Sequence, residues 1–235
     1  MAVFLGVILL CFTLFANTNY DEGLEAYRNK NYTKAIQYWK PMAINGNADS
    51  QFGLGVIYRN KKDYKKAVVW FKKAANQGNK NAQYNLGRMY NTGRGVLKNY
   101  KESIIWLTKA AIQGERNAQN NLGIMYRNGF GVGRNYKKSV FWFKKAANQN
   151  NVIAQSNLGF MYNNGLGVDK DYNKAIKWFK KAISRNDTWS KCQIAYSLFH
   201  LKKYKEAKKY VKEGYNEGQT KECQSVWNKL GLANY

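Results

Sequence analysis

Only a few side chains in this sequence are of types that carry out covalent or acid–base chemistry. The chain has one histidine, His200, and no serine or cysteine motif typical of a nucleophile lies beside it. The 14 Asp and Glu residues fall mostly in predicted turns or at helix starts, as Asp169 and Asp171 do, where capping explains them. Because catalysis needs titratable groups that converge, we predict that the protein is not an enzyme.

Two further motifs could suggest a ligand, and neither has the required pattern. The sequence GFGVG, which begins at Gly129, follows a predicted helix and lacks the Gly-Lys-Ser/Thr that completes a phosphate-binding loop. A zinc site is also not expected, because the cysteines outside the apolar N-terminal segment, Cys192 and Cys223, and the single His200 do not have the spacing of a zinc ligand set. The sequence therefore predicts no cofactor and no metal.

The elements that position all of these residues repeat along the chain. A tyrosine recurs at intervals of 32 or 36 residues, and glycines and aromatic residues keep the same phase. The tyrosines are Tyr32, Tyr64, Tyr100, Tyr136, Tyr172 and Tyr204. A period in this range is typical of a two-helix solenoid repeat. We expect repeats over about 18–47, 48–79, 80–115, 116–151, 152–187 and 188–218, followed by a cap helix over 219–235.

Each repeat contains two helical patterns joined by a turn. In the repeat that begins near Ala82, apolar residues fall at i, i+4 and i+8, and a second pattern begins at Tyr100. Turns of the form G-x-G-V, such as Gly93 to Val96, supply residues that tolerate positive φ, and the Asn or Asp before each tyrosine predicts a helix cap. Small residues mark the close approach of the two helices, and we expect the Trp and Tyr column that includes Trp106 to fill the space beside them.

These motifs also carry a family resemblance. The combination A-x-x-x-L-G-x-x-Y, then G-x-G-V, then D/N-Y-x-x-A/S-x-x-W-x-x-K-A-A resembles the Sel-one-like repeat, a relative of the tetratricopeptide repeat, over most of the chain. The resemblance implies an all-α fold, a right-handed superhelical solenoid of about six helix-turn-helix repeats plus a C-terminal cap helix. It also implies a curved scaffold whose first helices line a concave side that holds another protein.

The concave columns of the resemblance identify the candidate binding residues. They are Arg59, Tyr84, Arg88, Arg127, Phe160, Trp189, Tyr196 and Phe199. Trp, Tyr and Arg are the residue types that most often anchor interfaces. For Trp189 and Tyr196 the alternative is packing beneath the C-terminal cap helix.

The N-terminus predicts export. Residues 1–16 carry no charge and are almost wholly apolar, which is typical of a signal peptide, and the run is shorter than the roughly 20 apolar residues of a membrane span. No Lys or Arg precedes the apolar core and Leu14 is large for its place, so an uncleaved anchor is the alternative. The repeat domain, 17–235, would lie in the periplasm or outside the cell, without a stable membrane span if the signal is cleaved.

Export also changes how the cysteines are interpreted. Cys192 and Cys223 are separated by 31 residues, close to one repeat, so they could lie on neighbouring helices in an oxidising environment. A disulfide between them and two buried thiols both remain open from the sequence alone.

The net charge of +25 comes mostly from lysine. Pairs such as Lys72 and Lys73 fall on second helices, and we expect them opposite the Trp and Tyr column, as a basic convex ridge that attracts an anionic polymer. Nucleic acid is not an expected partner, because base reading favours arginine forks and aromatic platforms. The alternative is a solvated lysine face that reflects composition and serves solubility.

Taken together, these features predict a non-enzymatic protein-binding scaffold or adaptor in the bacterial cell envelope or secreted from the cell. Two alternatives stay open. One is an inhibitor or immunity protein that blocks a toxic or cell-wall-acting enzyme, and the other is attachment to an anionic envelope polymer through the basic convex face.

Overall fold

A computed structural model describes residues 19–183, 189–216, 220–229 and 231 of the chain. Every regular element in these ranges is a helix, and consecutive helices pack in pairs, which confirms the predicted all-α repeat fold. The chain divides into two compact units, Met1–Glu115 (unit 1) and Arg116–Tyr235 (unit 2), which are described separately. The predicted signal peptide, 1–16, lies outside the described residues.

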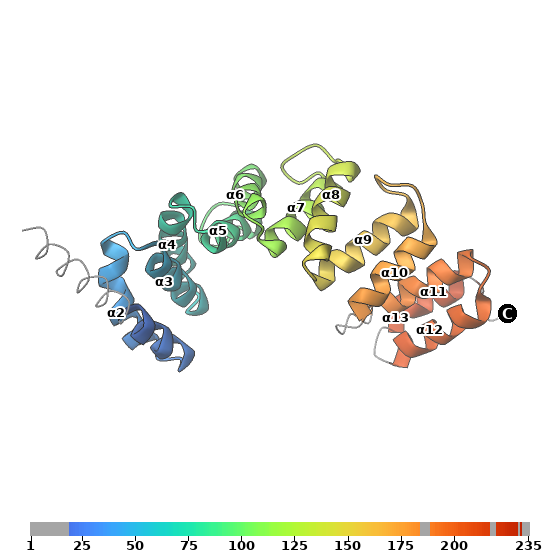
Figure 1. Ribbon diagram of the computed structural model, residues 1–235, viewed down its shortest axis with the longest axis horizontal. Helices are drawn as coiled ribbons and strands as arrows, with labels where there is room; N and C mark the ends of the chain where they lie inside the picture. The colour runs from blue at the N-terminus through green and yellow to red at the C-terminus, as the bar shows by residue number, and fades with distance from the viewer. Residues whose placement is uncertain (1–18, 184–188, 217–219, 230, 232–235) are drawn as a thin grey trace, which may run out of the picture. The chain divides into compact units, whose positions relative to one another are not determined.

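Unit 1 contains a helical stretch over residues 19–28, followed by five longer helices. Their bounds are α2 Tyr32–Ile44, α3 Ala48–Asn60, α4 Tyr64–Asn76, α5 Lys80–Thr92 and α6 Tyr100–Ile112. Within the unit, each helix from α2 to α5 packs against the next one along the chain (Figure 1).

Unit 2 continues the same pattern and ends with a shorter helix. Its helices are α7 Arg116–Asn128, α8 Tyr136–Asn148, α9 Val152–Asn164, α10 Tyr172–Ile183, α11 Trp189–His200, α12 Tyr204–Asn216 and α13 Thr220–Lys229. The last of them, α13, packs against both α11 and α12 and so covers the end of the array (Figure 1).

Side-chain caps fix where the helices begin. The predicted caps of the second helices are confirmed, because each side chain accepts a hydrogen bond from the backbone amide three residues later. These caps are Asn31, Asp63, Asn99, Asn135 and Asp171. The first helices α3, α5 and α9 are capped in the same way by Asn47, Asn79 and Asn151, which the sequence analysis did not predict.

The glycine turns take the backbone conformation that their sequence predicts. Gly93 and Gly165 end α5 and α9 in the left-handed region, with φ values of 71° and 66°. In the shorter turn before α4, the left-handed residue is Lys62, with a φ of 63°. The longer repeats therefore use glycine where the short repeats place a lysine.

In the first five repeats the core is built where a glycine on the first helix faces a large side chain on the second. A Cβ on Gly55 would lie 2.5 Å from the Phe71 ring, and one on Gly159 would lie 2.7 Å from the Phe179 ring, so only glycine permits this helix approach. The corresponding partners are Leu107 for Gly87 and Phe143 for Gly123.

The expectation that the Trp and Tyr column fills this space was wrong for most repeats. The residue after each tryptophan does so instead, and these residues, Phe71, Leu107, Phe143 and Phe179, are at most 1% exposed. The tryptophans Trp70, Trp142 and Trp178 are half-buried, because one residue turns a helix by about 100°. In the first repeat the same position is taken by Trp39, which follows Tyr38 and whose ring contacts both Gly23 and Gly53. Trp106 is the exception in the column, since it is only 7% exposed.

Buried glutamines link the repeats to one another. The Nε2 atoms of Gln51, Gln83 and Gln155 donate to the carbonyl oxygens of Ala43, Ala75 and Ala147 in the preceding repeat. At the other end of three repeats, Gln77, Gln113 and Gln149 donate to the Oε1 atoms of Gln51, Gln83 and Gln119 over 2.8 Å. The paired amides satisfy polar groups that burial would otherwise penalise.

A disulfide joins Cys192 on α11 to Cys223 on α13, with their Cα atoms 5.0 Å apart. Both cysteines are fully buried. A Cβ on Gly214 of α12 would lie 2.6 Å from the Cys223 sulfur, so this glycine leaves room for the bridge. The disulfide therefore ties the end of unit 2 together at a point where three helices meet.

Candidate functional site

The odd-numbered helices form the inner layer of each unit. In unit 1, α3 packs directly on α5, and in unit 2, α7 packs on α9 and α9 on α11. The even-numbered helices approach one another less closely, as expected where a stack of helix pairs curves toward its first helices. The candidate binding residues all lie on odd-numbered helices.

Unit 2 holds Arg127 of α7 in a fixed position on this layer. Its Nη1 donates to Oδ1 of Asn157 on α9 over 2.8 Å, and its Nε donates to Oδ1 of Asn128 over 3.3 Å. Asn157 is itself oriented, because its Nδ2 donates to Oδ1 of Asn120 over 3.3 Å. We call the pairing of Arg127 with Asn157 the arginine clasp of unit 2.

The arginine clasp borders a cavity of about 340 Å³, which we call the Arg127 pocket. Three successive odd-numbered helices line it, through Arg127, Ile153, Ser156, Asn157, Phe160 and Trp189. The pocket therefore combines a guanidinium, two small polar side chains and an apolar wall.

The apolar wall is held by ring contacts. The Phe160 and Trp189 ring centroids are 6.5 Å apart, and the Trp189 ring meets Phe179 of the core edge-on at 6.0 Å. The Arg127 guanidinium lies 5.9 Å from the Phe160 centroid. Both ring contacts of Trp189 are with α9 and α10, and the ring also faces the pocket, whereas packing beneath α13 was the alternative from the sequence.

The charge of Arg127 has no anionic partner among the described residues. Burial lowers the pKa of its guanidinium, and the nearby Tyr136 phenol partly opposes that effect. Arg127 donates to two amide oxygens and forms no ion pair with any described carboxylate. Unit 2 thus presents a half-buried positive charge whose hydrogen bonds within the described residues go to amide oxygens.

Unit 1 repeats the arginine clasp with different neighbours. Arg59 Nη1 donates to Oδ1 of Asn85 over 2.7 Å, and Asn85 Nδ2 donates to the Asn81 carbonyl oxygen. In place of a phenylalanine, this face carries Arg88, whose guanidinium lies 5.6 Å from the Tyr84 ring centroid. Burial raises the pKa of the Tyr84 phenol, and the positive charge of Arg88 lowers it in part.

Tyr196 and Phe199 do not line the Arg127 pocket. They surround the exposed His200, whose ring stacks on Tyr172 at 5.0 Å and meets Tyr196 edge-on at 4.5 Å and Phe199 at 5.8 Å. The structure therefore brings Arg127, Phe160 and Trp189 together and assigns the other two aromatic residues to a separate cluster.

Sequence reasoning missed the two asparagines that hold the arginines, Asn85 and Asn157, and also Ile153. A signal for the asparagines is present, since both occupy the same place in the A-Q-x-N-L-G motif. Their role is visible only when the arginine of the preceding repeat is placed beside them, 26 or 30 residues earlier.

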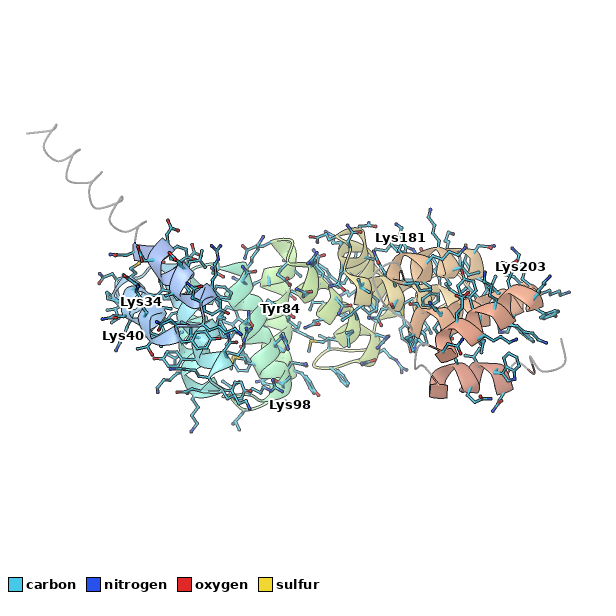
Figure 2. The ribbon with its side chains drawn as sticks, turned by 90° about the horizontal axis from the view of Figure 1, so that it is seen from below. Lys34, Lys40, Tyr84, Lys98, Lys181 and Lys203 are labelled. Carbon is cyan, nitrogen blue, oxygen red and sulfur yellow. A yellow bond between two sulfur atoms is a disulfide. The ribbon has the colours of Figure 1, made fainter. Side chains whose placement is uncertain are left out.

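Lysine side chains lie over the tryptophan rings on the even-numbered helices α4, α6 and α10. The Nζ atoms of Lys73, Lys109 and Lys181 lie 4.7, 4.5 and 4.4 Å from the ring centroids of Trp70, Trp106 and Trp178. The expectation that the lysine pairs lie opposite this column was therefore wrong for Lys73 and Lys181, the second lysines of two pairs, because residues three apart share a helix face. Figure 2 shows lysines on turns as well as helices, with Lys98 after α5 and Lys181 on α10.

Within the described ranges, no three His, Cys, Asp or Glu side chains lie together as a metal site would need. In the same residues, none of the helices combines the length and the apolar character needed to cross a bilayer.

Comparison with family models identifies the repeats. The model described as Sel1 repeat matches residues 80–115, 116–151 and 152–187, and a tetratricopeptide repeat model matches residues 20–82. No curated protein matches the chain.

Solved structures of Sel1 repeat proteins are also similar to this chain. A Sel1 repeat protein from Oxalobacter formigenes is 31% identical with a TM-score of 0.73, and the match covers 85% of this chain and 84% of that one. A protective antigen present in uropathogenic Escherichia coli strains, which displays an SLR fold, is 28% identical with a TM-score of 0.81. That match covers 89% of this chain but 48% of the antigen, so the chain spans about half the antigen's length.

A more distant likeness concerns the fold alone. PilF of Pseudomonas aeruginosa is 16% identical with a TM-score of 0.70, and the match covers 91% of this chain and 97% of PilF.

Proposed function

Because this chain belongs to the Sel1 repeat family, whose members generally mediate protein–protein interactions, we propose that it is a non-enzymatic scaffold that holds a partner protein on its inner face. The family is typically non-catalytic. Repeats of this kind vary their exposed columns independently of the residues that build the stack, so the identity of the partner depends on the inner-face side chains.

The observation that carries this proposal is the Arg127 pocket. Its half-buried arginine and aromatic rings are of the types that anchor protein interfaces, and they surround a cavity of about 340 Å³. In unit 1, Arg59, Tyr84 and Arg88 supply a second set of anchoring residues on the equivalent helices.

We also propose that the repeat domain, 17–235, acts in the cell envelope or outside the cell after export by residues 1–16. The Cys192–Cys223 disulfide supports this location, since such bonds persist mainly in oxidising compartments. The similarity to a bacterial protective antigen agrees with it. Fractionation of cells that produce the chain tests the proposal, and recovery of reduced protein in the cytoplasm would contradict it.

A capture experiment tests the scaffold itself. The full chain, immobilised and incubated with an envelope extract, should retain a partner that moderate salt does not release, because buried contacts are screened much less than exposed charges. Phe160→Ala and Arg88→Ala should reduce the captured amount while helix content stays unchanged. Capture that is unaffected by either substitution would contradict a partner site on the inner face.

The lysine-covered tryptophans favour a second candidate, attachment to an anionic envelope polymer through the even-numbered helices. Lys73 and Lys181 lie on aromatic rings that are half-buried, which places charge and apolar surface side by side. Attachment of this kind would depend strongly on ionic strength. Release of all bound material by moderate salt in the capture experiment would favour this candidate over the scaffold.

A further inference from the structure

We propose that the Arg127 pocket selects a peptide segment in which an Asp or Glu stands beside a large apolar residue. The carboxylate would bind the Arg127 guanidinium and the apolar side chain would pack on Phe160 and Trp189. This inference rests on the proposed function and names the chemistry that its unit 2 site recognises.

The carboxylate follows from the donors that Arg127 leaves open. A guanidinium has five N–H donors, and hydrogen bonds to Asn157 and Asn128 use two of them. Among the described residues nothing accepts from Nη2, so Nη1 and Nη2 together can hold a carboxylate through two parallel bonds. A half-buried cation gains more from a carboxylate partner than an exposed one does.

The fixed position of the guanidinium adds to this gain. Asn157 is held between Arg127 and Asn120, and Asn120 is only 5% exposed. The long arginine side chain has therefore already lost much of its rotamer freedom before any ligand binds, which lowers the entropic cost of binding.

The apolar residue of the proposed ligand is inferred from the aromatic side of the pocket, across from Arg127. Phe160 and Trp189 are half-buried and make ring contacts with each other and with the core. Ile153 is 61% exposed and continues the apolar surface to the edge of the pocket. A ligand that extends past the cavity would cover this isoleucine as well.

The lining of the cavity by three helices favours part of a chain over a whole metabolite. Its volume of about 340 Å³ is at the lower end of the range of roughly 300–1,000 Å³ found for small-molecule sites. It is lined from α7, α9 and α11, so a short extended segment could lie across three helices while one large side chain enters the cavity.

The test begins with a random heptapeptide library displayed against the full chain. We expect the enriched peptides to carry Asp or Glu next to Phe, Trp, Tyr, Leu or Ile. The affinity of the most enriched peptide, labelled for fluorescence anisotropy, should fall about tenfold or more with Arg127→Gln. Phe160→Arg, which creates the residue found at the equivalent position of unit 1, should weaken it similarly.

Arg134→Gln is the matched control. Arg134 lies in the turn between α7 and α8, is exposed, and belongs to the same unit, so this change removes an equal charge outside the pocket. Its effect on affinity should stay within about twofold, and circular dichroism should show the same helix content for all three variants. Replacing the acidic residue of the peptide by its amide should cost as much as Arg127→Gln, and combining both changes should add little.

Several results would overturn the inference. Enriched peptides without an acidic residue, equal binding by the Arg127→Gln variant, or no enrichment at all would each exclude this ligand class. Phenylacetate serves as a small-acid probe, and binding as tight as that of the peptide would show that the site takes a free carboxylic acid. If envelope partners are still captured by Arg127→Gln, the scaffold function stands and only this assignment fails.

Discussion

The inner faces of the two units share the arginine clasp and differ in the side chains that surround it. In both units, the arginine of a Y-R-N motif donates a hydrogen bond to the asparagine of an A-Q-x-N-L-G motif one repeat later. In unit 1 the clasp faces Tyr84 and a second arginine, whereas in unit 2 it faces Phe160 and Trp189.

The difference shows which positions a repeat can change. Arg88 and Phe160 occupy the same place, directly after the glycine of the L-G pair, yet the glycines Gly87 and Gly159 contact the core in the same way. A side chain one residue from the packing contact thus changes the chemistry of the exposed surface without altering the stack. The two units offer chemically distinct surfaces on one framework.

The largest expected effect tests the shared framework. Phe71→Ala in unit 1 and Phe143→Ala in unit 2 should each cost about 3–5 kcal/mol of unfolding free energy, because both rings are fully buried against a glycine. Urea unfolding followed by circular dichroism measures the loss. Val69→Ala and Phe141→Ala, at residues that are 54% and 50% exposed, are the matched controls. A near-neutral result for either buried ring would mean that the two units are not built alike.

The next prediction separates the units. Reduction of the Cys192–Cys223 disulfide should destabilise unit 2 by about 3 kcal/mol, since the bond closes a loop of 31 residues in the unfolded chain. Hydrogen exchange read by mass spectrometry should show faster exchange in α11 to α13 and no change in α2 to α6. Faster exchange that extends equally through unit 1 would argue against independent units.

A smaller effect tests the arginine clasps. Asn85→Ala and Asn157→Ala each remove a hydrogen-bond acceptor of a charged group, and each should cost about 1–2 kcal/mol of unfolding free energy. Only Asn157→Ala should also weaken the acidic-apolar peptide, because it frees the guanidinium in the Arg127 pocket. Equal losses of peptide affinity in both variants would remove the distinction between the two faces.

The smallest effect concerns two caps, one in each unit. Hydrogen bonds from the Lys66 side chain and amide lower the pKa of Asp63, and those from the Lys174 amide and side chain lower the pKa of Asp171. A carboxyl with a lowered folded pKa stabilises the fold above its ordinary pKa near 3.8 and loses this contribution as the pH falls through the lowered value.

Asp63→Asn and Asp171→Asn supply the cap that other repeats already use. At neutral pH the melting temperature should change by less than about 2 °C. Between pH 4 and pH 2 each variant should lose less stability than the parent chain, as thermal unfolding at several pH values would measure. An unchanged acid-side slope would show that neither carboxyl contributes.

Much of the architecture was predictable because the repeat presents each signal several times. The helix caps at Asn99 and Asn135 and the left-handed glycines of the long turns follow from residue types with narrow backbone preferences. The resemblance to the Sel-one-like repeat was likewise confirmed.

The identity of the buried aromatic residue was not predictable in the same way. Trp70 and Phe71 are both large and apolar, and the sequence does not show which of them points at Gly55. The tryptophan column is the more conspicuous pattern, but lysine stems three residues later cover it from outside. A rotation of about 100° between neighbours separates core from surface, which is finer than spacing alone resolves.

The residue types of the candidate site were predictable, whereas their grouping was not. Arg127, Phe160 and Trp189 come from three repeats, and only their packed helices show that they border one cavity while Tyr196 and Phe199 surround His200.

Because of the glutamine pairs, a repeat carries polar contacts of its own junction within its own sequence. A block such as 80–115 contains both partners of its own amide bond, Gln83 and Gln113, and reaches its predecessor through an alanine carbonyl, which any residue type could supply. Copying such a block within the gene would thus lengthen the stack without requiring new complementary mutations. In the block 152–187 an arginine, Arg185, stands at the place of the second glutamine, and it lies outside the described residues.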